Sequence, residues 1–119
     1  MQWIILVGNE NLSLGTIENM KFIGSKKVAQ VSKERIVVDY GEDHVFFDYA
    51  NDIINDYEED ELLLLPFEKP RFIMMTFSST FILKKILTDN NFPNKLYIDD
   101  DQGNILKIED YIRLLNSGG

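Results

Sequence analysis

The sequence predicts a single α+β domain over residues 1–119, with a mixed or mainly antiparallel sheet of six to eight strands and three to four helices packed on it. Three observations lead to this prediction. Two short, almost wholly apolar runs are typical of buried strands. A segment at about 27–49 alternates apolar and polar residues, as the strands of a meander do. Elsewhere, apolar residues recur at helical spacing after residues that cap helices.

The first element is a strand at residues 2–7, which is nearly all apolar and therefore suited to burial on both faces. It ends at Gly8. Leu14, Ile17 and Met20 then recur at the spacing of one helix face, and Ser13 is placed to cap that helix.

The charged residues of the second hairpin of the meander predict its strand register. A two-residue loop at 41–42, with the glycine at positive φ, would close it. Arg35 then lies opposite Asp48, and Asp39 lies opposite His44, so that opposite charges pair across the strands. The same register places four apolar side chains on one face: Ile36, Val38, Val45 and Phe47.

The first hairpin of the meander extends this apolar face. With a loop at 33–34, Val31 lies opposite Ile36 and Ala29 lies opposite Val38.

A helix begins at Asn51 or Asp52, with Ile53, Ile54 and Tyr57 on one side. Acidic residues at 58–61 follow, and acids are unfavourable at the C-terminus of a helix. The helix therefore either stops near Tyr57 or tolerates an unfavourable cluster. Residues 62–65 are predicted to form a short strand or a buried turn.

The remaining elements repeat the same signals. Residues 72–77 are a second buried strand, and residues 78–80 cap a helix with an apolar stripe that ends before Pro93. Residues 95–98 and 105–108 form a last hairpin, and 109–115 form a final helix.

Charge is distributed very unevenly along the chain. Residues 36–68 hold eleven acids and no lysine or arginine, whereas the rest holds nine acids and twelve basic residues. The net charge of −8 is therefore −11 in this segment and +3 outside it. A strongly negative surface attracts basic proteins and repels nucleic acids and anionic membranes. We expect a basic protein partner, and neither nucleic acid nor membrane as a partner.

Tyrosines are interleaved with these acids, and tyrosine is enriched at binding hot spots. Acids that only keep the surface soluble are the alternative explanation. In size, charge and lack of a catalytic motif, the chain resembles bacterial immunity proteins, which neutralise basic toxins; this is a similarity of kind, since no family motif is present. The predicted partner-binding residues are Tyr49, Asp52, Asp56, Tyr57, Glu58, Glu59, Asp60 and Glu61.

A small-ligand-binding or regulatory domain is the alternative function. Its site would lie at the ends of the two buried strands, near Asn9, Asn11, Ser78 and Ser79.

The sequence offers little for catalysis, metals or cofactors. His44 is the one histidine, and cysteine is absent, which excludes disulfides, thiolate zinc sites and thiol nucleophiles. The acids at 99–101 suggest a calcium loop, but Gly103 comes one residue too early for an EF-hand, which favours a hairpin turn. We expect a cytoplasmic protein that is not an enzyme, has no catalytic residues and binds no cofactor or metal.

Overall fold

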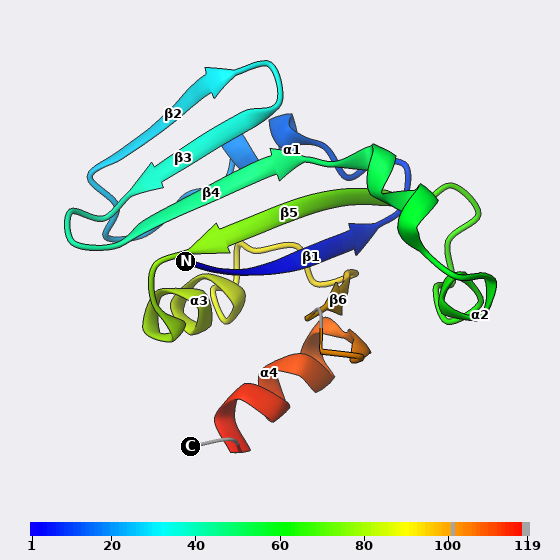
Figure 1. The fold of residues 1–119 in the computed structure, drawn as a ribbon. Coiled ribbons are helices and arrows are strands. Elements are labelled where there is room, and N and C mark those ends of the chain that lie inside the picture. The colour runs from blue at the N-terminus through cyan, green and yellow to red at the C-terminus, as the bar shows by residue number, and fades with distance from the viewer. Residues whose placement is uncertain (101, 118–119) are drawn as a thin grey trace.

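The computed structural model describes residues 1–100 and 102–117, which form a seven-stranded antiparallel sheet in the order β2-β3-β4-β5-β1-β6-β7 (Figure 1). The strands are β1 (Gln2–Gly8), β2 (Lys27–Ser32), β3 (Arg35–Asp39), β4 (His44–Tyr49), β5 (Arg71–Phe77), β6 (Tyr97–Asp99) and β7 (Ile105–Lys107). The helices are α1 (Leu14–Glu18), the 3₁₀ helix η1 (Asn51–Asp56), α2 (Glu59–Leu62), α3 (Thr80–Leu87) and α4 (Ile108–Ser117). The predicted α+β class and strand number are confirmed, and the sheet is antiparallel throughout these residues.

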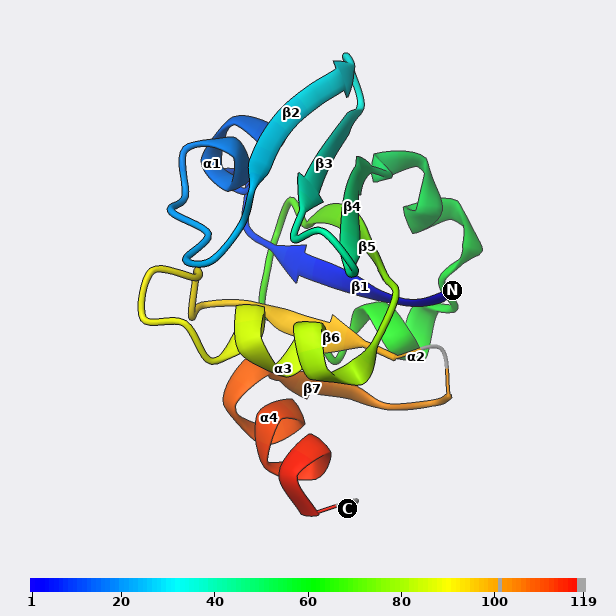
Figure 2. The same cartoon turned by 90° about the vertical axis from the view of Figure 1, so that its left-hand side faces the viewer.

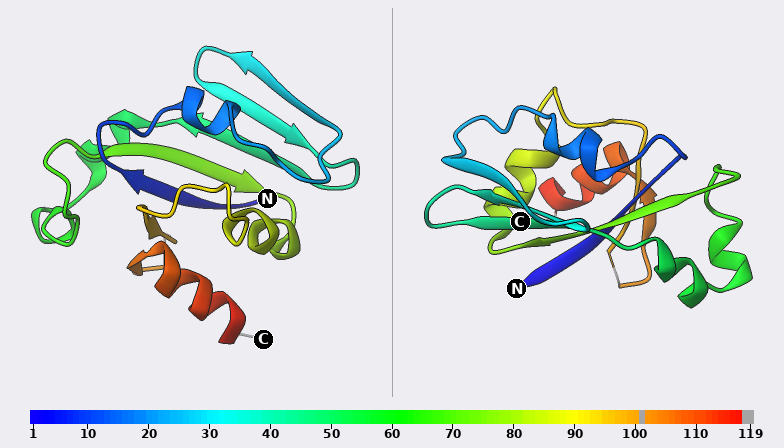
Figure 3. Two further views of the ribbon diagram at one scale, coloured as in Figure 1. Left: turned by 180° about the vertical axis from the view of Figure 1, so that it is seen from behind. Right: turned by 90° about the horizontal axis from the view of Figure 1, so that it is seen from above.

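Each face of the sheet carries its own hydrophobic core. The larger core lies between the sheet and helices α1, α3 and α4, and the smaller core lies on the other face beneath η1 and α2 (Figure 3, right). Strand β1 contributes to both, because Ile4 and Leu6 enter the larger core while Ile5 and Val7 enter the smaller one. The two-sided burial predicted for residues 2–7 is thus confirmed for residues 4–7, whereas Gln2 is exposed and Trp3 is partly buried.

The second hairpin of the meander has the predicted register. Arg35 lies opposite Asp48, and its Nε donates to Oδ1 of Asp48 at 2.6 Å. Asp39 lies opposite His44, with Oδ1 of Asp39 3.4 Å from Nε2 of the imidazole. Gly41 has the positive φ of 96° that the tight loop requires.

The first hairpin corrects the prediction. Its loop is at 33–34 as expected, but a β-bulge at Val31 shifts the pairing by one residue. Val28 therefore lies opposite Val38 and packs against the larger core, whereas Val31 is 56% exposed.

The acidic residues after η1 begin a helix. η1 ends at Asp56, and Glu59, Asp60 and Glu61 occupy the first turn of α2, where negative charge is favourable. The first alternative for this segment is thus confirmed, since the helix stops before Tyr57. The predicted strand or buried turn at 62–65 is wrong, because Leu62 ends α2 and only Leu65 of these residues is buried.

The C-terminal third follows the predicted order. Oγ of Ser79 accepts a hydrogen bond from the backbone N–H of Ile82 and so caps α3. The β6–β7 hairpin and α4 then close the end of the sheet next to α3 (Figure 2).

Tyr40, which packs against the larger core, makes the stability of the fold depend on pH. Burial and the nearby charge of Asp89 raise its pKa to about 12, and Nζ of Lys85 lies 5.3 Å from the centre of its ring. An unfolded tyrosine titrates near 10. Stability linked to Tyr40 is therefore fully present below about pH 10 and is lost as pH rises to about 12.

We expect the free energy of unfolding to fall by about 1–2 kcal/mol over this window, after allowing for partial solvent screening. Tyr40→Phe should remove most of that fall in urea titrations at a series of pH values. A smaller slope should remain because the pKa of Tyr111 is also raised, by burial and by Asp100. An unchanged pH dependence in Tyr40→Phe would contradict the assignment.

Candidate partner-binding site

Three of the four acids of the β3–β4 hairpin are engaged in local structure, and the fourth, Glu42, is exposed at its tip. The carboxylate of Asp48 is held by Arg35, and that of Asp39 lies beside His44. Asp43 accepts a hydrogen bond from the hydroxyl of Ser78 at 2.7 Å. The acidic side chains that remain for a partner are concentrated in η1 and α2.

A groove lies where η1 and α2 approach the β1 and β6 end of the sheet. It has a volume of about 290 Å³, and it is called here the acidic groove. Three carboxylates lie along it, and none of the described side chains that line it is basic. Its lining residues are Trp3, Ile5, Ile53, Asp56, Tyr57, Glu61, Asp99, Gly103 and Ile105.

Hydrogen bonds fix two of these carboxylates. The hydroxyl of Tyr57 donates to Oδ2 of Asp99 at 2.6 Å, and the ring of Tyr57 packs on Phe72 with centroids 5.2 Å apart. The Oε1 atom of Glu61 accepts from the backbone N–H of Glu58 at 2.9 Å. Two of the three carboxylates are thus held in place by hydrogen bonds within the protein.

The groove has the chemistry to hold a lysine or arginine side chain. Carboxylates form charge-assisted hydrogen bonds to an ammonium or guanidinium group. Trp3 adds an aromatic face, which attracts cations, and it packs partly buried against the smaller core. Ile5 and Ile105 supply apolar walls for the aliphatic part of such a side chain.

The structure brings only some of the predicted partner-binding residues together. Asp56, Tyr57 and Glu61 line the acidic groove. The side chains of four others are exposed on η1 and α2 outside it: Asp52, Glu58, Glu59 and Asp60. Tyr49 is apart from them, because it packs against the larger core on the other face of the sheet and its hydroxyl accepts a hydrogen bond from Arg71.

Two exposed leucines adjoin the acidic helix. Leu63 is 80% exposed and Leu64 is 57% exposed, directly after α2. A large apolar side chain in water is favourable to bury against a partner. The sequence prediction missed them because it placed this apolar run inside the fold.

The residues of the predicted small-ligand site are separated. Strands β1 and β5 are antiparallel, so that Gly8 pairs with Arg71 and Gln2 pairs with Phe77. Asn9 and Asn11 therefore lie at one end of these strands, and Ser78 and Ser79 lie at the other. Asn9 and Asn11 border a hollow of about 140 Å³, and Ser79 is used as the cap of α3.

His44 lies near a hydroxyl, but the geometry is not that of an activated nucleophile. The pairing of β4 with β5 brings Ser78 to its backbone, and the Ser78 Oγ accepts from the His44 N–H at 3.0 Å. That hydroxyl donates to Asp43, while the imidazole faces Asp39. A base must bond the nucleophile that it activates, and the described contacts contain no such bond between Ser78 and the His44 ring.

The turn after β6 holds its own acid. The carboxylate of Asp100 accepts from the backbone N–H groups of Gln102 and Asn104 and from the Asn104 side chain, and Gly103 has φ of 90°. These are features of a hairpin turn; Asp101 lies outside the described residues. In the part of the chain that is described, no three acids or histidines are grouped as metal ligands.

Among the helices of residues 1–100 and 102–117, none combines the length and apolar character that crossing a bilayer requires. No protein-family model, curated protein or solved structure matches this chain at a level that indicates a relationship.

Proposed function

We propose that this protein is a non-enzymatic interaction module of the cytoplasm that binds a basic segment of another protein in the acidic groove. The observation that carries the proposal is the convergence of Asp56, Glu61 and Asp99 on one groove that also contains Trp3 and Tyr57. These side chains come from four separate elements, so the cluster is a property of the fold and not only of an acid-rich sequence. A basic toxin domain, the partner of an immunity protein, is one partner with the required chemistry.

Long-range attraction and short-range contact would have different roles. The net charge of −8 would attract a basic partner and raise the association rate toward roughly 10⁸–10⁹ M⁻¹s⁻¹ at low salt. Trp3, Tyr57 and the exposed Leu63 and Leu64 would then bury apolar area and slow dissociation.

Neutralising the groove should weaken binding more than neutralising the surface beside it. In the double variant Asp56→Asn/Glu61→Gln, we expect the loss of about 1–2 kcal/mol of binding free energy, or roughly 5- to 30-fold in Kd. Glutamine keeps an oxygen that can accept the bond from the Glu58 N–H. Fluorescence anisotropy with a labelled hexalysine peptide measures the effect.

The matched control is Asp52→Asn/Glu59→Gln, which removes the same charge from exposed positions outside the groove. This control should change Kd by less than about threefold, and wild-type binding should weaken from about 0.02 M to about 0.5 M salt. Equal weakening in the two double variants would refute a specific groove. A cellular partner retained equally at both salt concentrations would refute the electrostatic mechanism.

A further inference from the structure

Strand β1 has an open edge along its first three residues. Its seven residues all pair with β5, but on the other side β6 pairs only with Ile5, Leu6 and Val7. Of the described residues, none forms a ladder with Gln2–Ile4 on that side. Strand β6 ends at Asp99, and the next residue bonds across the β6–β7 hairpin, from the Asp100 N–H to the Asn104 carbonyl.

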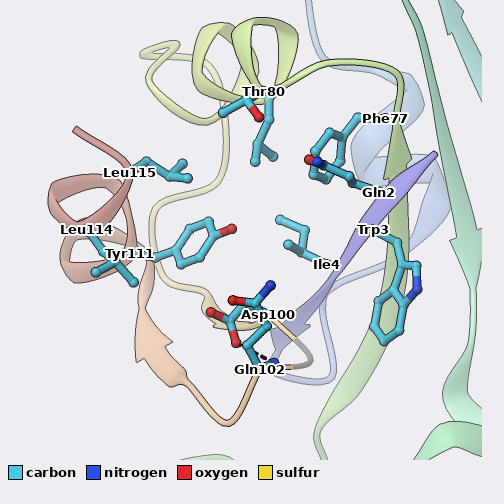
Figure 4. A pocket seen from close by; sticks show the side chains of 11 residues that line it. Gln2, Trp3, Ile4, Phe77, Thr80, Asp100, Gln102, Tyr111, Leu114 and Leu115 are labelled. Atoms are coloured by element: carbon cyan, nitrogen blue, oxygen red, sulfur yellow. Dashed lines mark hydrogen bonds between the residues drawn. The ribbon is translucent and has the colours of Figure 1, made fainter. Parts of the chain in front are cut away.

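A groove lies on each face of the sheet at this edge. The acidic groove is on the side of Trp3 and Ile5. The second, of about 330 Å³, is on the side of Gln2 and Ile4 and is called here the apolar groove (Figure 4). Trp3 borders both grooves, so the open edge lies between them.

Helices α3 and α4 form one side of the apolar groove, and its rim and other side are lined by polar side chains, those of Gln2, Thr80, Asp100 and Gln102. Leu83 comes from α3, and Tyr111, Leu114 and Leu115 come from α4. The Tyr111 hydroxyl points into the groove (Figure 4), where it can donate a hydrogen bond. Burial, and to a smaller extent the charge of Asp100, raise the pKa of this hydroxyl. Leu114 of the amphipathic helix α4 is 43% exposed and lines this groove.

We propose that the partner adds a short β-strand along Gln2–Ile4, with apolar side chains entering the apolar groove and basic side chains entering the acidic groove. Successive side chains of a strand point to opposite faces of the sheet. A strand at this edge therefore presents alternate residues to the two grooves. Main-chain hydrogen bonds supply affinity, and the two grooves select an alternating apolar and basic sequence. The basic half of this pattern rests on the function proposed above.

Charge decides between this occupant and a second copy of the chain. Pairing of two β1 edges would bring two acidic grooves and two chains of net charge −8 together. Like charges across an interface disfavour association. A basic strand instead supplies the cations that this edge lacks.

Peptides of about six residues test the geometry. The alternating peptide repeats leucine and lysine, and the block peptide has the same composition with all leucines before all lysines. We expect the alternating peptide to bind the whole chain at least about tenfold more tightly than the block peptide. On binding, the backbone amides of the Gln2–Ile4 edge should become protected from hydrogen exchange in NMR spectra.

N-methylation distinguishes strand pairing from simple charge attraction. Alternate N–H groups of an edge strand point toward and away from the sheet. Methylating one alternate set of peptide nitrogens should abolish binding, and methylating the other set should leave Kd within about threefold of the parent peptide. Equal affinity of both methylated forms, or of the alternating and block peptides, would overturn strand addition.

Leu114 tests the contribution of the apolar groove to peptide binding. Leu114→Asp should weaken the alternating peptide about tenfold or more, whereas Val31→Asp, at an exposed position on the far edge strand β2 and outside both grooves, should weaken it less than about threefold. One outcome is that hexalysine binds the two double variants with different affinities while the alternating and block peptides bind with equal affinity. In that case strand addition fails and the proposed function stands. If no basic peptide binds, both fail. A concentration-dependent dimer that the alternating peptide displaces, seen by sedimentation, would assign the edge to self-association and overturn the proposal.

Discussion

Replacing Phe47 by alanine is expected to lower the free energy of unfolding by about 3–5 kcal/mol. Phe47 is fully buried in the larger core, where its ring lies 5.9 Å from that of Phe22. It is flanked by Ile36 on β3 and Met75 on β5, so the cavity would open in the middle of the sheet. Since a domain of this size has about 5–15 kcal/mol of stability, the variant loses a large part of it.

Phe46→Ala is the matched control for this prediction. Phe46 is the preceding residue, and it lies half-buried on the opposite face with the Arg35 guanidinium 4.9 Å from its ring centre. Its loss should cost about 1 kcal/mol, because most of the vacated space is open to solvent. Urea unfolding of both variants gives the comparison. A larger loss in Phe46→Ala than in Phe47→Ala would mean that β4 presents the other set of side chains to the core, and similar losses would contradict the predicted difference in burial.

Replacing Phe72 by alanine is expected to cost a similar 3–5 kcal/mol or so, but with a different local effect. Phe72 is fully buried in the smaller core. Among the residues that the structure describes, the apolar ones of η1 and α2, and Tyr57, pack against this core and not against the larger one. The ring contact with Tyr57 would be lost. We expect the segment that carries the acidic groove to loosen before the rest of the sheet unfolds.

Hydrogen exchange of residues 51–65 measures this effect. Phe47→Ala is the control, because it removes the same side chain from the core on the other face of the sheet. Exchange in this segment should be faster in Phe72→Ala than in Phe47→Ala at matched global stability. Hexalysine binding should weaken in parallel. Equal exchange in the two variants would show that the segment does not depend on the smaller core.

Most of the fold could be predicted because local patterns and long-range pairing agree. The register of the second hairpin followed from two opposite-charge pairs, and both of them form in the structure. The bulge could not be predicted in the same way. Val28 and Val31 are equally apolar, so either pairing of β2 leaves a valine on the core face, and only packing against the larger core selects Val28.

The helix α2 was missed although a local signal was present. Glu58 and Glu61 are three residues apart before an apolar run, which is the spacing at a helix N-terminus. The preceding helical pattern at Ile53, Ile54 and Tyr57 obscured this signal by assigning the acids to its end.

The part of the candidate site that was predicted comes from one continuous segment of the chain. Asp56, Tyr57 and Glu61 are close in sequence and were predicted together. Trp3 and Asp99 were missed, because their proximity depends on β6 pairing beside β1. The spacing of these residues along the sequence does not show that β6 pairs with β1, because the strand order is not known from the sequence.

The central position of β1 has a consequence for synthesis in the cell. Both of its partners, β5 and β6, come much later in the chain. At a translation rate of about 5–20 residues per second, the apolar first strand waits roughly 5–20 s on the ribosome before residues 97–99 have been added. It has no partner strand until β5 has been added at residues 71–77, and its other side is uncovered until β6 follows. Exposed apolar segments of this kind are prone to aggregation, and they are what chaperones bind. Folding of this domain is therefore a late event, governed by the arrival of its last strands.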